Sequence, residues 1–73
     1  MPSLRVLSGK QVVKILAKNG FAEVRRRGSH VVMQKRAGDS TTTVIVPDHR
    51  EIRIGTLASI IRQSRLPHRA FES

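Results

Sequence analysis

The pattern of apolar and polar positions predicts two helices separated by three strands. The first helix covers residues 8–18, where apolar side chains recur on one face and lysines on the other. Ser8 and Gln11 have the spacing of a capping box, in which each side chain bonds the backbone N–H of the other residue. Asn19 and Gly20 then form a stop signal. The apolar face consists of Val12, Val13, Ile15, Leu16 and Ala17.

Three extended segments follow, at residues 21–27, 29–36 and 41–46. Gly28 permits a tight turn after the first segment, and Ala37-Gly38-Asp39-Ser40 is a turn sequence after the second. The third segment, TTTVIV, is rich in β-branched residues and is typical of a strand. Short turns between successive strands predict an antiparallel meander.

The second helix follows a loop at residues 47–54. Thr56 is the expected N-cap, and Pro67 ends the helical stretch. Residues 68–73 are expected to form a frayed tail. Apolar or small side chains recur at the i, i+3, i+4 and i+7 positions of this helix, which are Leu57, Ile60, Ile61 and Ser64.

This order of elements, α-β-β-β-α, predicts a single α+β domain over residues 1–73. Both helices are amphipathic, so each needs an apolar partner. The simplest solution is a three-stranded antiparallel sheet with both helices on one face and the opposite face open. Double-stranded-RNA-binding domains have this architecture, but the architecture alone does not fix a function.

Charge is the strongest bulk feature. The chain has 14 Lys plus Arg against 5 Asp plus Glu, which gives a net charge of +9. Such a balance favours a polyanionic partner, and we expect nucleic acid rather than a membrane, because no helix joins a basic face to bulky aromatic anchors. The absence of cysteine favours a reducing compartment, so we expect a cytoplasmic protein.

The segment Arg25-Arg26-Arg27-Gly28-Ser29-His30 is the most informative stretch for chemistry. If Val31 and Met33 face the helices, strand alternation sends His30 to the open face. Val32, Gln34 and Arg36 then share that face. Under this register an imidazole stands in solvent directly after a cluster of arginines.

RNA can be cleaved without a metal ion when a base removes the proton of the 2′-hydroxyl and cations stabilise the charge of the transition state. His30 is the candidate base. The nearest cations along the chain are Arg25, Arg26, Arg27, Lys35 and Arg36. Lys10, Lys14 and Lys18 form a helical stripe that either extends this track or is a solvated face. The structural alternatives are a surface histidine and a charged, soluble edge strand.

Other chemistries fit the sequence less well. The five carboxylates form no cluster with the character of a two-metal site, and Asp48, His49 and Glu51 are only a weak signal for one ion. We therefore expect no metal and no cofactor. Ser29 is a poor nucleophile, because it and His30 would point to opposite faces of the strand. His49 is either a second acid/base or a loop histidine that fixes backbone geometry.

At this point the chain resembles the HicA-type (YcfA-like) mRNA interferase toxins of bacterial toxin–antitoxin modules. Four segments carry the resemblance, in the right order and at compact spacing. They are SGKQVVKILAKNGF from residue 8, RRGSH from residue 26, VIVPDH from residue 44, and EIRIGTL from residue 51 with the following Ile60-Ile61-Arg62-Gln63.

The resemblance implies a double-stranded-RNA-binding-like fold, metal-free cleavage of mRNA, and a HicB-type antitoxin that covers the catalytic residue, which maps to His30. The chain departs from the family pattern in three places. Val31-Val32 follows the Gly-Ser-His motif, Ile54 replaces a frequent proline, and Ser64-Arg65-Leu66 stands where many members have Ala-Gly-Leu. These departures concern packing and helix termination more than chemistry.

Two other functions remain open. A non-catalytic RNA-binding module would need a phosphate-binding lysine cluster at the start of the second helix, and Gly55 to Ser59 contains no lysine. A purely protein-binding subunit would use its basic face to dock an acidic partner.

Overall fold

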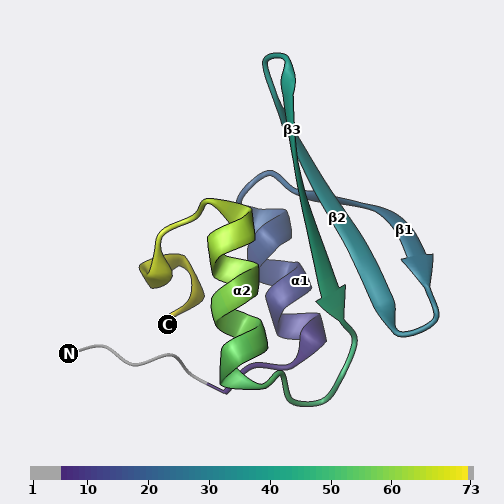
Figure 1. The fold of residues 1–73 in the computed structure, drawn as a ribbon, viewed down its shortest axis with the longest axis vertical. Helices are drawn as coiled ribbons and strands as arrows, with labels where there is room; N and C mark the ends of the chain where they lie inside the picture. The colour runs from purple at the N-terminus through teal and green to yellow at the C-terminus, as the bar shows by residue number, and fades with distance from the viewer. Residues whose placement is uncertain (1–5, 73) are drawn as a thin grey trace.

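The computed structural model describes residues 6–72 and has the predicted order of elements (Figure 1). A short 3₁₀ helix, η1, follows the second α-helix. The elements are α1 (Gly9–Lys18), β1 (Ala22–Arg27), β2 (His30–Ala37), β3 (Ser40–Pro47), α2 (Ile54–Ser64) and η1 (His68–Phe71). Within residues 6–72, no helix has the length and apolar character that a membrane span requires.

The three strands form one antiparallel sheet in the order β1-β2-β3. Strands β2 and β3 pair along their whole length, and their hairpin projects beyond the helices (Figure 1). The β1–β2 register shifts between Glu23 and Arg25, which marks a bulge at Val24. The predicted meander is therefore confirmed, and each strand boundary lies within one residue of the expected one.

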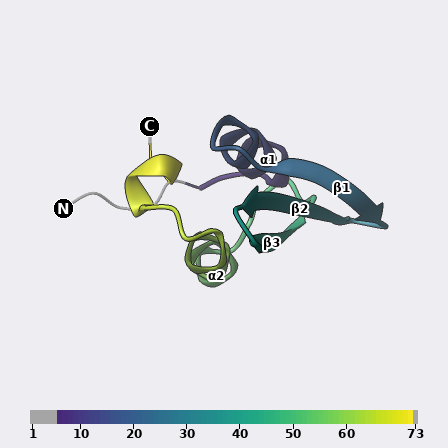
Figure 2. The same cartoon turned by 90° about the horizontal axis from the view of Figure 1, so that it is seen from above.

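The hydrophobic core lies on one face of this sheet. Val31 and Met33 of β2 are buried, as are their cross-strand partners Val46 and Val44 of β3. Both helices pack against this face, and Figure 2 shows α1 near β1 and α2 near β3. The helices contribute Val12, Leu16, Leu57, Ile60 and Ile61 to the core. The prediction of two helices on one face and an open opposite face is confirmed.

Helix α1 begins with the expected capping box. The Ser8 hydroxyl accepts a hydrogen bond from the Gln11 backbone at 3.1 Å, and the Gln11 side chain accepts one from the Ser8 backbone at 2.9 Å. These bonds satisfy backbone donors that have no partner inside the helix. Asn19 is the C-cap, as the stop signal predicted.

The start of α2 differs from the prediction. Thr56 is not the N-cap, because the helix begins at Ile54 after Arg53, whose side chain makes no capping bond. Ile52 is buried, and its backbone donates to the Leu7 carbonyl at 2.8 Å. This anchor fixes the chain before Arg53, so the helix starts three residues earlier than a side-chain cap at Thr56 would allow.

The frayed tail predicted for residues 68–73 is wrong for the residues described. Residues 68–71 form η1, and Phe71 is completely buried against the core. Arg65, in the left-handed conformation (φ 62°), and the bond from the Leu66 backbone to the Ser64 hydroxyl turn the chain back toward α1. Phe71 is one of two aromatic residues, and burying its ring offsets the cost of ordering the segment. Ser73 lies outside the described residues.

Candidate functional site

His30 is exposed at the start of the central strand β2. It pairs with Arg27 of β1 on one side and with Pro47 of β3 on the other. Because its neighbour Val31 is buried on the helix face, His30 lies on the opposite, open face, as the alternation predicted. The imidazole therefore stands at the end of the sheet where all three strands meet.

A shallow hollow extends from His30 across the open face. Arg27, Val32 and Ile45 line it together with His30. A second hollow continues along β1 and β2 past Arg25 and Gln34. Three aliphatic side chains run through these hollows, Val24, Val32 and Ile45, and we refer to them as the open-face strip. Val24 and Ile45 are about half exposed, at 53% and 51%.

A second pocket lies on the other side of His30, between β3 and the start of α2. Both His30 and His49 line it, and we call it the two-histidine pocket. Its other lining residues are Pro47, Glu51, Ile52, Arg53 and Thr56. The sequence left the role of His49 open, and the structure brings its side chain to the same pocket as His30.

Backbone hydrogen bonds hold the segment that carries His49. The Asp48 backbone donates to the Ser29 carbonyl at 2.6 Å, which ties the segment to the residue before His30. The Gly9 backbone donates to the His49 carbonyl at 2.8 Å. Asp48 also accepts a bond from the Arg26 guanidinium at 2.9 Å. Elements on three sides therefore fix the segment next to His30.

The arginine cluster divides between the two faces of the sheet. Arg25 and Arg27 pair with Val32 and His30, so they share the open face with the imidazole. Arg26 pairs with Val31 and points the other way, where it bonds Asp48 and approaches Glu23 at 3.9 Å. The structure thus places Arg27 beside His30, and Arg25 on the same face opposite Val32.

The two cations of β2 do not lie beside His30. Lys35 follows Val31 and Met33 on the helix face, where its ammonium lies 5.9 Å from the centroid of the Phe21 ring. Arg36 is exposed on the open face, but it lies six positions along the strand from His30, a distance of roughly 20 Å. Strand alternation already placed Lys35 on the opposite face of the sheet from His30, although the proximity of the two residues in sequence suggested a common site.

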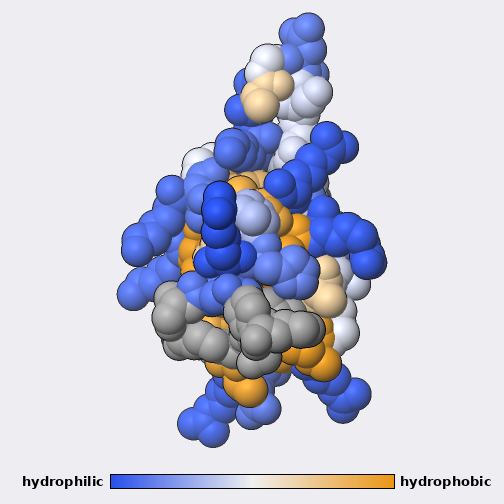
Figure 3. Space-filling view, turned by 90° about the vertical axis from the view of Figure 1, so that its left-hand side faces the viewer, coloured by the Kyte–Doolittle hydropathy of each residue, from blue (hydrophilic) through white to orange (hydrophobic). Residues whose placement is uncertain are grey.

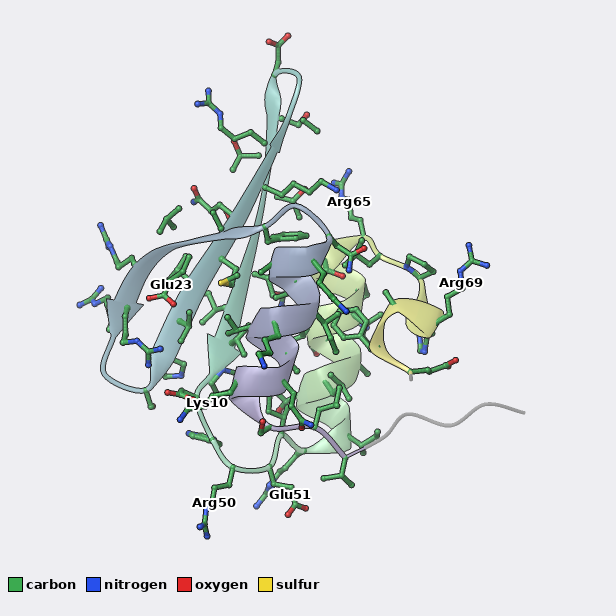
Figure 4. The ribbon with its side chains drawn as sticks, turned by 180° about the vertical axis from the view of Figure 1, so that it is seen from behind. Lys10, Glu23, Arg50, Glu51, Arg65 and Arg69 are labelled. Atoms are coloured by element: carbon green, nitrogen blue, oxygen red, sulfur yellow. The ribbon has the colours of Figure 1, made fainter. Side chains whose placement is uncertain are left out.

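Lys10 and Lys14 are exposed on α1, with Lys18 at the end of the same stripe. Lys10 lines a hollow next to His49 and Arg50. Figure 4 shows Lys10, Arg50 and Glu51 toward one end of the molecule, whereas Arg65 and Arg69 lie on the side of η1. Sequence reasoning missed Arg50 and Arg53, which lie in the same segment as His49 and line the hollows next to it.

Among residues 6–72, no group of three or more His, Asp or Glu side chains is arranged to hold a metal ion. His68 lies in η1 and does not line either hollow next to His30. Figure 3 shows that hydrophilic side chains also cover much of the face on the η1 side, with hydrophobic surface between them.

Comparison with known families gives one finding. A family model described as the HicA toxin of bacterial toxin–antitoxin systems matches residues 9–66. The matched region runs from the first residue of α1 to just beyond α2, and it includes both histidines of the two-histidine pocket. No curated protein and no solved structure matched the chain.

Proposed function

The chain belongs to the HicA toxin family of bacterial toxin–antitoxin systems, and we propose that it is an endoribonuclease that cleaves mRNA with His30 as general base. The observation that carries the proposal is the exposed imidazole of His30 beside Arg27, at the junction of two hollows. Free histidine titrates near pH ~6.5, so an imidazole exchanges protons readily at neutral pH.

The proposed reaction uses the RNA itself as nucleophile. Neutral His30 accepts the proton of a ribose 2′-hydroxyl, and the oxygen forms a bond to the adjacent phosphorus. The bond between phosphorus and the 5′-oxygen of the next nucleotide breaks, which leaves a 2′,3′-cyclic phosphate and a 5′-hydroxyl end. Neighbouring guanidinium groups stabilise the negative charge of the transition state. DNA lacks the 2′-hydroxyl and is not a substrate of this reaction.

Arg25 and Arg27 are the proposed phosphate contacts on the open face, because they share it with His30. Lys10 and Lys14 extend the positive surface along α1, past the hollow that Lys10 lines with His49. Arg36 can reach a longer RNA near the end of the hairpin. Arg26 and Lys35 are engaged with Asp48 and Phe21, so we assign them weaker roles in RNA binding. RNA binding of this kind depends strongly on salt.

A toxin of this class has an antitoxin partner, and we propose a HicB-type protein that covers His30. The open-face strip offers apolar contact area next to the imidazole, and Arg25 and Arg27 stand at its edge. An acidic partner with aliphatic side chains complements this surface and the net charge of +9. Because the substrate is mRNA, we place the protein in the cytoplasm.

Incubation of the purified protein with an end-labelled mRNA, with and without EDTA, tests the proposal. Discrete fragments in both reactions are expected, since no step requires a metal. An intact RNA that is only shifted on a native gel would instead identify a non-catalytic RNA-binding module. Cleavage that EDTA abolishes would identify a metal-dependent nuclease.

A further inference from the structure

We infer that the cleaved phosphate binds in the two-histidine pocket and that His49 is a second catalytic residue, which protonates the leaving 5′-oxygen. The inference rests on the proposed function and goes beyond it, because it names the second proton-transfer group and the place of the scissile bond. It also assigns Arg53 to the phosphate.

Two imidazoles that line one pocket can serve the two proton transfers of the reaction. His30 pairs with Pro47 across β2 and β3, and His49 follows Pro47 by two residues. The hollow on the open face offers only His30 among Arg27, Val32 and Ile45. A phosphate placed there would leave both proton transfers to a single imidazole. The two-histidine pocket is therefore the better place for the scissile bond.

Backbone hydrogen bonds and a close contact with the start of α1 hold the backbone around His49. Its carbonyl accepts from the Gly9 backbone, and the preceding residue donates to the Ser29 carbonyl, at 2.8 and 2.6 Å. Gly9 is buried, and a β-carbon there would lie 2.7 Å from the Cα of Asp48. The start of α1 therefore presses closely on this segment. Such support on several sides is what a catalytic side chain needs to keep its geometry.

The charge of the pocket lining suits a phosphodiester. Arg53 contributes a guanidinium, and its side chain makes no hydrogen bond or ion pair to any residue in the range 6–72. Glu51 is the only carboxylate of the lining, and Figure 4 shows its side chain pointing outward at the end of the loop. The lining is therefore net positive once one imidazole is protonated, which favours a bound phosphate anion.

The imidazoles of His30 and His49 are also free to exchange protons with a substrate. Within the described residues, neither ring makes a hydrogen bond or an ion pair with another side chain. In the proposed step, His30 gains the proton of the 2′-hydroxyl while protonated His49 gives its proton to the 5′-oxygen as the P–O bond breaks. The total number of protons on the pair is unchanged, and exchange with water restores the starting state.

A substrate that needs no leaving-group protonation tests the role of His49. The cleavage site is first mapped in an mRNA, and an oligonucleotide is then made with sulfur in place of the bridging 5′-oxygen at that site. A thiolate leaves without a proton, so this substrate removes the need for a general acid. His30→Gln, His49→Gln and, as a matched control, His68→Gln are compared with the wild type on both substrates under single turnover.

We expect His49→Gln to cleave the oxygen substrate at least about 100-fold more slowly and to recover most of that loss on the sulfur substrate. Its melting temperature and RNA affinity should stay near those of the wild type, and His68→Gln should match the wild type throughout. His30→Gln should stay slow on both substrates. The Arg53→Ala protein should bind the same RNA more weakly and cleave it more slowly than the wild type.

A His49→Gln variant that cleaves the oxygen substrate at the wild-type rate overturns the inference and leaves the proposed function intact. The inference is also overturned if His49→Gln is folded and binds RNA but cleaves the sulfur substrate as much more slowly than the wild type as it cleaves the oxygen substrate. The proposed function is left intact in that case too. A wild-type protein that leaves all RNA intact overturns the proposed function and this inference together.

Discussion

Arg26 donates to Asp48 at 2.9 Å, and this ion pair joins the end of β1 to the segment that carries His49. The side chains are 48% and 24% exposed, so water screens much of their attraction. Ion pairs of this kind contribute about 0–1 kcal/mol to stability. The main effect of the ion pair is therefore to position residues 47–49 next to His30, rather than to stabilise the fold.

Arg26→Ala should lower the rate of RNA cleavage several-fold while it changes the free energy of unfolding by less than about 1 kcal/mol. Loss of the pair loosens the segment, but the backbone bonds of Gly9 and Asp48 remain. Single-turnover cleavage and urea denaturation measure the two effects. A variant with lower RNA affinity and an unchanged rate when saturated with RNA would show that Arg26 binds phosphate instead.

Arg25 and Arg27, on the same face as His30, should account for the salt dependence of RNA binding near that residue. Each phosphate contact to single-stranded RNA contributes roughly 0.7 to the slope of log affinity against log salt. The double variant Arg25→Ala, Arg27→Ala should therefore lower this slope by about 1.4, measured by fluorescence anisotropy. Arg69→Ala, on the η1 side of the molecule (Figure 4), is the matched control and should leave the slope unchanged. Equal slopes in both variants would exclude the open face as the RNA surface.

Substitution by alanine should have opposite effects on stability at the two glycines near the helix starts. A β-carbon at Gly9 would meet the backbone of Pro47 and Asp48, so Gly9→Ala should destabilise the fold by about 1–3 kcal/mol and also slow cleavage. Gly55 has open space around its Cα, so Gly55→Ala should be neutral or stabilising by up to about 1 kcal/mol. Chemical denaturation of both variants checks the pair. Equal stabilities would contradict the close contact between α1 and residues 47–49.

Phe71→Ala should destabilise the protein by about 3–5 kcal/mol, because its ring is fully buried in the core. That loss is a large part of the stability of so small a protein. Phe71→Leu keeps most of the apolar volume and should cost less, which allows a comparison if the alanine variant fails to fold. Melting temperatures equal to the wild type in both variants would show that η1 does not contribute to the core.

Local patterns were sufficient to predict most of the fold. Alternation in β2 predicted that Val31 and Met33 face the helices, where both are buried, and it also placed His30 on the open face. The capping box of α1 was predictable because its two partners are three residues apart. These signals depend on neighbours in sequence, and the tertiary structure did not override them.

The features that were missed depend on contacts between distant residues. Arg26 and Asp48 are 22 positions apart, and nothing near either one indicates the pairing. Phe71 follows a proline and a polar stretch, so its burial against the core could not be predicted from periodicity. The pocket shared by His30 and His49 requires the register of β2 against β3, which places Pro47 opposite His30.

The most direct test of the central claim compares cleavage by His30→Ala with that by the wild type, at RNA concentrations that saturate both proteins. His30 is exposed and is not one of the core residues, so the variant should fold and bind RNA like the wild type. We expect it to lose cleavage by at least about 100-fold and to lose growth inhibition on induced expression. Undiminished cleavage by a folded His30→Ala protein would remove this residue from the mechanism.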